Sequence, residues 1–317
     1  MENHKRTQDR VAIHSIDHFA LNVPSVAEAD RFFRAFGLDV RHAGAGDGDS
    51  NSERELYAAD QHRWGRILPA KSKSLAYLSL NCFSADLAAL EAQVRAAGGA
   101  FEFDHPVCNQ QGFWFYDPDG NLIQVKAGLK TSPSSKSLTT FEQAPADRRG
   151  AYPRSEVKTV SPRRLSHVLL FTPDVARIVA FYEQALGLRL SDRSLDIIAF
   201  THAPHGSDHH LIAFAKSHAK GWHHCSWDVA SLDEVGLGAG QMTAAGYTRG
   251  WGTGRHVLGS NYFHYVQDPW GSFSEYSADI DFVAAGSDWP AGNFSPDDSL
   301  YLWGPAVPDY FICNTEL

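Results

Sequence analysis

The feature that most constrains the fold is an internal duplication, because one sequence pattern occurs twice about 150 residues apart. The segment IDHFALNVPSV, followed by AEADRFFRAFGL, recurs as LSHVLLFTPDV, followed by ARIVAFYEQALGL. His18 therefore matches His167, 149 positions further on, and Pro24 matches Pro173 at the same offset. Later, YDPDGNLIQV recurs as QDPWGSFSEYS at an offset of 151. A chain with this pattern is predicted to fold as two similar units.

Each unit contains the signals of both strands and helices. The apolar run that ends at Pro24 predicts a strand, and the amphipathic segment behind it predicts a helix that ends at Gly37, as its counterpart ends at Gly187. Alternating apolar runs and a second helical segment follow in each half. This order predicts an α+β fold with a mostly antiparallel sheet in each of two tandem domains.

The boundaries follow from composition. Residues 131–163 are rich in Ser, Thr, Pro and charge without periodicity, which predicts a linker. The aromatic residues of the final segment would bury much apolar area, so we expect this tail to pack on the second domain. The predicted divisions are a disordered lead-in 1–12, a non-catalytic domain 13–130, the linker 131–163, a metal-binding domain 164–282 and the tail 283–317.

Charge and hydropathy exclude several classes of function. Lys and Arg total 28 against 37 Asp and Glu, a net charge of -9, which argues against a nucleic-acid partner or an acidic membrane surface. No run approaches the roughly 20 apolar residues that span a bilayer, and the polar N-terminus does not resemble a secretory signal. The four cysteines show no CxxC spacing. We expect a cytoplasmic protein that acts on a small molecule.

The two halves act as controls for each other. Within a residue or two of alignment error, Tyr77 stands in the first half where His224 stands in the second, and Gln124 stands where Glu275 stands. The first half keeps His18, but one histidine does not hold a metal. Any metal chemistry is therefore predicted for the second half, with the first half structural.

His167, His224 and Glu275 are the predicted metal ligands. Alternation along WHHCSWDV places the more apolar set with His223 toward a helix layer and selects His224 as the ligand. A carboxylate buried in the strand of Glu275 must be paired or bound to a metal. Two imidazoles and one carboxylate bind divalent iron with three positions open, and the set contains no cysteine, which disfavours structural zinc.

The remaining polar groups receive roles around this metal. His210, 14 residues before His224, is predicted to be the acid–base catalyst because histidine exchanges protons near neutral pH. Tyr265 and His256 are predicted to hydrogen-bond a substrate oxygen. The predicted substrate-binding residues are His202, Trp222, Trp251 and Phe263. Further histidines, including His205, His209, His218 and His264, are assigned to loops or outward positions.

Over residues 14 to about 280 the chain resembles the type I extradiol catechol dioxygenases, the two-domain branch of the vicinal oxygen chelate superfamily. The resemblance rests on the histidine pair, the GRH phrase, the tyrosine and the glutamate at their relative spacings. It implies domains that are each a pair of βαβββ modules forming an open, barrel-like mixed sheet around a cavity.

The same resemblance implies a chemistry. It implies Fe(2+), with Mn(2+) as the other candidate metal, bound by His167, His224 and Glu275 with His210, His256 and Tyr265 around it. The implied reaction inserts both atoms of O2 into a catechol beside its hydroxyl groups. The aromatic neighbours favour a substituted or fused ring, and the family implies a homo-oligomer.

Other functions on this fold are distinguishable. A 2-oxoacid-dependent oxygenase does not require a histidine 14 residues before the second ligand, so His210 argues against it. A glyoxalase-like lyase or isomerase draws ligands from both halves, which Tyr77 and Gln124 disfavour. A metal-free binding protein would be recognised by its lack of stoichiometric iron or manganese.

Overall fold

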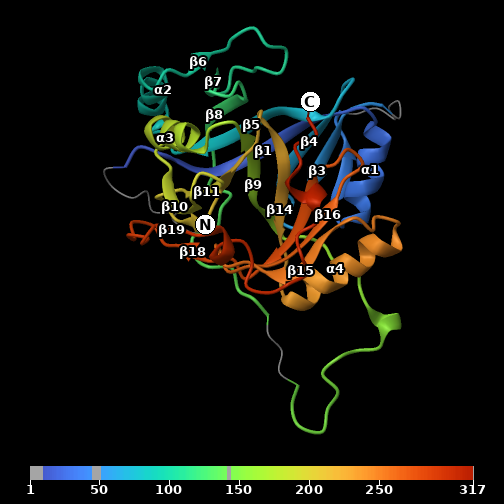
Figure 1. Ribbon diagram of the computed structural model, residues 1–317. Coiled ribbons are helices and arrows are strands. Elements are labelled where there is room, and N and C mark those ends of the chain that lie inside the picture. Colours follow the sequence, from blue (N-terminus) through green and yellow to red (C-terminus); the bar gives the residue numbers. More distant parts are fainter. Residues whose placement is uncertain (1–9, 45–50, 141–143, 317) are drawn as a thin grey trace.

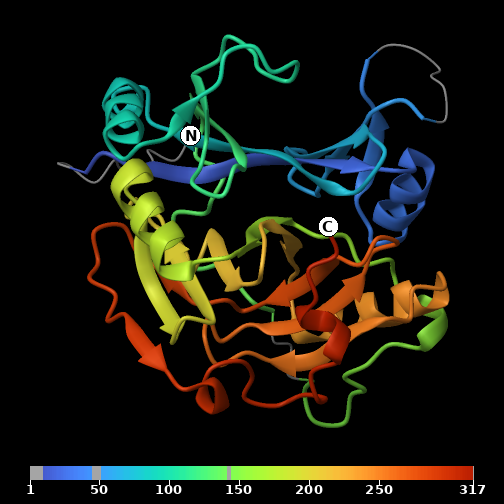
Figure 2. The same cartoon turned by 45° about the horizontal axis from the view of Figure 1, so that its top comes forward.

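The computed structural model describes residues 10–44, 51–140 and 144–316, so residues 1–9 of the predicted lead-in lie outside the described chain. Each half of the sequence forms its own large sheet, and the two halves pack together (Figure 1; Figure 2). No helix among the described residues is long and apolar enough to cross a membrane.

The first half consists of two consecutive βαβββ modules. Their elements are β1 (Ile13–Val23), α1 (Val26–Ala35), β2 (Asp39–His42), β3 (Arg54–Tyr57) and β4 (Arg63–Pro69), then β5 (Ser74–Cys82), α2 (Leu87–Ala96), β6 (Ala100–Phe101), β7 (Phe113–Tyr116) and β8 (Leu122–Ala127). The sheet order is β2-β3-β4-β1-β5-β8-β7-β6. The modules meet at the antiparallel pair β1–β5, and each ends in a parallel pair, β1–β4 or β5–β8.

The second half repeats this plan with additions. Its elements are β9 (Arg164–Thr172), α3 (Val175–Leu186), β10 (Arg189–Ser194), β11 (Ile198–His202), β12 (Ser207–Asp208), β13 (Ile212–Lys216), β14 (Gly221–Asp228), α4 (Leu232–Ala244), β15 (Gly250–Arg255), β16 (Tyr262–Gln267), β17 (Phe273–Ala278), β18 (Phe282–Val283) and β19 (Gly292–Phe294). The main sheet order is β15-β16-β17-β14-β9-β13-β11-β10-β19. The central pair β9–β14 is antiparallel, whereas β9–β13 and β14–β17 are parallel.

The predicted fold class is confirmed: there are two tandem α+β domains, each with a mixed sheet. Neither sheet closes into a barrel, because the outer strands of each sheet remain edges. Short 3₁₀ turns occur at Arg154–Glu156, Pro296–Asp298 and Asp309–Ile312. In Figure 1 the residues from 144 to the turn at Arg154–Glu156 form a loop that extends away from the body of the molecule.

Local sequence explains how the helices begin and end. Ser25 begins α1 by accepting the backbone N–H of Glu28, and Asp174 begins α3 by accepting that of Arg177. Gly187 ends α3 at a φ of 69°, where a side chain would also meet the carbonyl oxygen of Val11. The predicted helix end at Gly187 is therefore confirmed.

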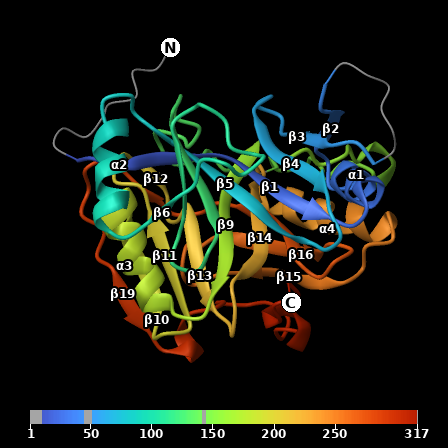
Figure 3. The same ribbon diagram turned by 90° about the horizontal axis from the view of Figure 1, so that it is seen from above.

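The two halves are joined by helix contacts at both ends of the sheets. Figure 3 shows α2 beside α3 at one end and α1 beside α4 at the other, and Gln241 of α4 donates to the carbonyl oxygen of Ala35. Between the two halves, the fully buried ring of Phe36, at the end of α1, stacks on the ring of Tyr276 with centroids 3.9 Å apart. The tyrosine hydroxyl donates to the Phe36 carbonyl oxygen at 2.8 Å. Phe36 thus fastens the first half to strand β17.

We predict that Phe36→Ala lowers the free energy of unfolding by about 3 to 5 kcal/mol, because it empties a buried aromatic site between the halves. Urea denaturation followed by tryptophan fluorescence measures this. Phe103→Ala is the matched control: its ring is 75% exposed, so we expect a change within about 0.5 kcal/mol. Equal losses for the two variants would contradict the assignment of Phe36 to the interface.

Candidate active site

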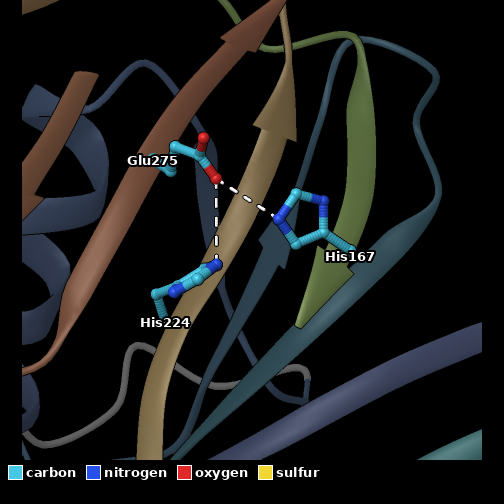
Figure 4. Close-up of side chains that lie close together, drawn as sticks. All are labelled: His167, His224 and Glu275. Atoms are coloured by element: carbon cyan, nitrogen blue, oxygen red, sulfur yellow. Dashed lines mark ion pairs between the residues drawn. The ribbon is translucent and has the colours of Figure 1, made fainter. Parts of the chain in front are cut away.

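Three neighbouring strands present the predicted ligands to one another. His167 lies on β9, His224 on β14 and Glu275 on β17, and β14 is the strand between the other two. In the strand register Ser226 of β14 pairs with both His167 and Glu275. Figure 4 shows the two imidazole rings and the carboxylate directed toward one point. The strand ladder, and not a loop, holds all three groups.

The geometry of this cluster suits a metal ion. Glu275 Oε2 lies 3.3 Å from Nε2 of His167 and 3.8 Å from Nε2 of His224, and one donor atom from each residue lies within 4.8 Å of the others. The three side chains are at most 4% exposed. His224 Nε2 and Glu275 Oε2 have no hydrogen-bond partner. Burying a carboxylate oxygen and an imidazole nitrogen in this way is costly unless a cation binds them.

His223 fixes which nitrogen of His224 faces the cluster. His223 Nε2 donates to the carbonyl oxygen of Phe311 at 2.7 Å, and its Nδ1 lies 2.7 Å from Nδ1 of His224. Since a neutral His223 then has only an acceptor at Nδ1, His224 must donate from Nδ1. This leaves the Nε2 lone pair of His224 for a metal, the arrangement that groups behind metal ligands commonly enforce.

The predicted orientation of His223 is wrong, and a β-bulge is the reason. The register of β14 against β9 shifts between Trp222 and His224, so alternation fails at this point. His223 consequently lines the same cavity as His224, whereas Trp222 packs against Phe19 of the first half with ring centroids 5.0 Å apart.

A second hydrogen-bonded group borders Glu275. His256 donates from Nδ1 to the carbonyl oxygen of Leu300 at 2.7 Å, so its Nε2 accepts from the Tyr265 hydroxyl at 2.9 Å. Glu275 Oε1 accepts from the amide of Asn261 at 3.1 Å. Burial raises the pKa of Tyr265 well above its usual value and lowers that of His256. The pair is therefore a neutral hydrogen-bonding unit at neutral pH.

His210 stands beside the ligand cluster. Its ring lies 3.9 Å, centroid to centroid, from that of His167 and 4.8 Å from Phe200. Burial, followed by the neighbouring histidines, lowers the pKa of His210 well below 6.5. His210 is thus neutral at physiological pH and has the form of a base.

These groups meet at one end of a cavity of about 280 Å³. His167, His210, His224, His256 and Tyr265 all line it, so the structure brings five of the six predicted metal and catalytic residues to its wall, with Glu275 directly behind them. The rest of the lining is mainly apolar. Representative residues are Leu169, Phe171, Ile198, Phe200, Leu258 and Phe311.

Sequence reasoning missed several lining residues. Asn261 was not predicted, although it contacts Glu275 and lines the cavity. Leu300 and Phe311 belong to the tail, whose lack of periodicity gives no signal for a role in the site. His223 had a signal, the adjacent histidine pair, but the strand alternation indicated the wrong face.

None of the four predicted substrate-binding residues lines this cavity. Trp222 faces the first half for the reason given above. His202 is buried beside Ser191, whose hydroxyl lies 2.7 Å from its Nδ1. Trp251 and Phe263 lie one layer behind, where Phe263 stacks on His256 with centroids 4.1 Å apart and Trp251 stacks on Tyr265 at 5.7 Å. These two rings support the polar groups and do not contact the cavity.

Two histidines assigned to loops or outward positions are instead buried. His205 and His209 are each at most 3% exposed. Both follow β11 in a segment whose burial local polarity does not reveal.

The first half contains a hydrogen-bonded counterpart of the site. Ser79 pairs with His18 and Gln124 in the same register as Ser226 pairs with His167 and Glu275, so the predicted equivalence of Gln124 and Glu275 is confirmed. Two residues before Ser79, Tyr77 occupies the position of His224. Its hydroxyl contacts His18 Nε2 at 2.9 Å, and Gln124 accepts from Ser79 at 2.8 Å. These polar groups satisfy one another without a metal.

The chain belongs to the Glyoxalase/Bleomycin resistance protein/Dioxygenase superfamily, whose family model matches residues 15–125 and 164–276. It is 61% identical over 307 residues to Metapyrocatechase 2 of Cupriavidus necator, which covers 97% of this chain and 94% of that protein. It is 26% identical over 289 residues to biphenyl-2,3-diol 1,2-dioxygenase of Pseudomonas sp. strain KKS102, covering 82% of this chain and 87% of that one. The resemblance to the two-domain extradiol dioxygenases is confirmed.

Solved structures share the fold. The Mn(II)-bound glyoxalase from Novosphingobium aromaticivorans superposes with a TM-score of 0.72 at 25% identity, covering 94% of each chain. An extradiol ring-cleaving dioxygenase from B. fuscum superposes with a TM-score of 0.72 at 19% identity, covering 98% of this chain and 85% of that one.

We predict that His224→Ala weakens binding of a divalent metal by at least about 100-fold, because it removes one of three buried ligands. Anaerobic isothermal titration calorimetry with Mn²⁺ measures the affinity and the number of ions bound. His18→Ala removes the equivalent histidine of the first half and should still bind one ion per chain. A loss of binding in His18→Ala, or its retention in His224→Ala, would place the metal elsewhere.

Buried histidines also predict a pH dependence of stability. Burial lowers the pKa of His14 to about 3 and that of His202 to about 4, against 6.5 when unfolded. Because the unfolded chain then binds more protons, stability is lost as the pH falls below 6.5, by about 1 to 2 kcal/mol for each group near pH 5.

Urea unfolding of the wild type and of His14→Leu at pH 7.5 and pH 5 tests this. The variant should lose less stability on acidification than the wild type. The exposed His218 provides the control, since His218→Leu should show the wild-type loss. Identical losses in wild type and His14→Leu would mean that His14 does not titrate on unfolding.

Proposed function

We propose that the protein is an extradiol dioxygenase that cleaves catechols bearing an apolar substituent or a fused ring. The observation that carries the proposal is the buried His167–His224–Glu275 cluster beside a mainly apolar cavity. The 61% identity of the chain to Metapyrocatechase 2, over nearly its whole length, supports the same conclusion. Among residues 10–44, 51–140 and 144–316, this is the one His, Cys, Asp and Glu cluster with ligand geometry.

The proposed metal is Fe(2+), with Mn(2+) as the alternative. His167, His224 and Glu275 would hold it, and their mixed nitrogen and oxygen donors suit either ion. When bound, a redox-active divalent metal would supply the electron transfer that allows a catechol to react with dioxygen. The unpartnered Nε2 of His224 and Oε2 of Glu275 are the atoms in this structure that such an ion would satisfy.

Protein groups supply the proton transfers and the orientation. His210, neutral because burial lowers its pKa, accepts a proton from a catechol hydroxyl and returns it later in the reaction. Tyr265 and His256 form a hydrogen-bonded pair at the same end of the cavity, and the Tyr265 oxygen can accept a hydrogen bond from a substrate hydroxyl. Tyr265 is held on strand β16, and the tail carbonyl of Leu300 accepts from His256, which preorganises this pair.

The lining of the cavity supports the proposed substrate class. Phe171 and Ile198 would contact the part of the ring that carries the substituent. Lys216 also lines the cavity, but its ammonium is 3.6 Å from the carboxylate of Asp196 and its side chain is 46% exposed. An alkyl or aryl substituent therefore fits this wall better than a carboxylate. The cytoplasmic location and the homo-oligomeric state stay predictions.

The proposal is tested by anaerobic reconstitution with ferrous iron, followed by air and a panel of catechols with alkyl, aryl or carboxyl substituents. We expect oxygen uptake and a yellow ring-cleavage product, fastest with alkyl or aryl groups. His210→Asn should lower kcat by about 100-fold or more because it removes the base. The exposed His218→Asn should retain wild-type kcat.

Each outcome separates the candidate functions. Iron binding without turnover of any catechol would exclude extradiol cleavage and direct the search to 2-oxoacid substrates. Isomerisation of a thiol adduct of a 2-oxoaldehyde would identify a glyoxalase-like enzyme. A chain that binds no divalent metal would be a binding protein on this fold.

A further inference from the structure

A buried carboxylate and a second histidine stand behind the proposed base. His209 is fully buried between β12 and β13, and its Nε2 lies 2.8 Å from Oδ2 of Asp192 on β10. On the other side of the same ring, Nδ1 of His209 lies 3.0 Å from Nδ1 of His210. The three side chains form a continuous row that ends at the cavity wall.

The proton positions in this row follow from the donors around Asp192. The backbone N–H of Gly292 donates to Oδ1 at 2.6 Å, and the indole N–H of Trp289 donates to Oδ2 at 3.3 Å. Asp192 therefore acts as an acceptor toward every neighbour, and His209 must carry its proton on Nε2. A neutral His209 then offers only a lone pair at Nδ1, so the proton in the contact between the two histidines belongs to His210.

We infer that Asp192 and His209 are positioning residues that hold His210 as the Nδ1–H tautomer, with the lone pair of Nε2 available to the substrate. The inference rests on the proposed function for what that lone pair does. The opposite tautomer would place an N–H where the base is needed, and a histidine in the wrong tautomer is a poor base.

The orientation of both rings is fixed by packing. His210 lies against His167 and Phe200, and His209 lies against Trp289 with ring centroids 5.3 Å apart. Strand β19 pairs in parallel with β10, which places Trp289 and Gly292 of the tail over Asp192. Ser191 donates to the carbonyl oxygen of His209 and so ties the backbone of the histidine pair to β10. Strand pairing, ring packing and a backbone hydrogen bond therefore hold the row in place.

A second histidine pair uses the same arrangement. In His223–His224 the first ring also contacts the second through both Nδ1 atoms, and its Nε2 is held by an acceptor, the carbonyl oxygen of Phe311. There the result is a lone pair directed at the metal site. In His209–His210 the acceptor is a carboxylate, and the lone pair is directed at the substrate end of the cavity.

The tautomer can be read directly by long-range ¹H–¹⁵N spectra of histidine-labelled, full-length protein loaded with diamagnetic Zn²⁺. We expect His210 to show the Nδ1–H pattern and His209 the Nε2–H pattern. His210 found with its proton on Nε2, or His209 protonated on both nitrogens at pH 7.5, would overturn the inference. This readout does not depend on turnover, so it is separate from the test of the proposed function.

Two variants of His209 test the consequence for the reaction. His209→Gln can donate to Asp192 and accept from His210, whereas His209→Leu can do neither. With the ferrous enzyme and its best catechol, we expect kcat of His209→Leu to fall by about 10- to 100-fold with little change in KM. His209→Gln should recover most of that loss. Equal kcat values for the two variants would contradict the positioning role.

His18→Leu is the matched structural control. His18 is also buried beside a carboxylate, with Nδ1 2.6 Å from Asp17 Oδ2, but it belongs to the first half and lies outside the cavity. Its loss should lower the thermal midpoint while kcat stays at the wild-type value. A fall in kcat as large as that of His209→Leu would show that the loss of any buried histidine beside a carboxylate lowers the rate, and the inference would fail. If the tautomers are as expected but no catechol is cleaved, the proposed function fails instead.

Discussion

A buried carboxylate with one unsatisfied oxygen is the constraint on which the rest of the second half depends. Asn261 satisfies Oε1 of Glu275, but Oε2 faces only the Nε2 atoms of two histidines. A charge in such a place costs several kcal/mol unless a cation neutralises it. The central strands β9, β14 and β17 are what make the position possible, because their pairing keeps the three groups together. Burial lowers the pKa values of His210, His224 and His256, which disfavours positive charge on these three neighbours.

The sequence predicted the parts of this arrangement that depend on regular strands and on the duplication. The equivalence of His18 with His167 aligned the two halves, and the register confirms that Gln124 occupies the position of Glu275. The sequence alone shows that the first half lacks the second histidine and the glutamate of the second half, and this difference indicates which half holds the candidate metal site. The end of α3 could also be predicted, because capping residues and glycines act on the residues next to them.

The failures share a physical cause, which is that local periodicity does not determine tertiary contacts. One bulge after Trp222 changed the faces of two residues of β14. His223, which was expected to face outward, lines the cavity, and Trp222, which was expected to face inward, does not. Asn261 stands in a loop, where no pattern predicts the direction of a side chain. The tail gave no periodic signal, yet Leu300 and Phe311 provide carbonyl acceptors to His256 and His223.

The tail also has a consequence for the order in which the site is assembled. Residues 289–311 supply acceptors to His223 and His256 and donors to Asp192. A ribosome releases β9 to β17 before this segment, and domains begin to fold as they emerge. A nascent chain at that stage contains His167, His224 and Glu275 but lacks the tail carbonyl oxygens that accept from His223 and His256. Competence for oxygen chemistry is thereby delayed until the segment that follows the second sheet has been translated and has docked.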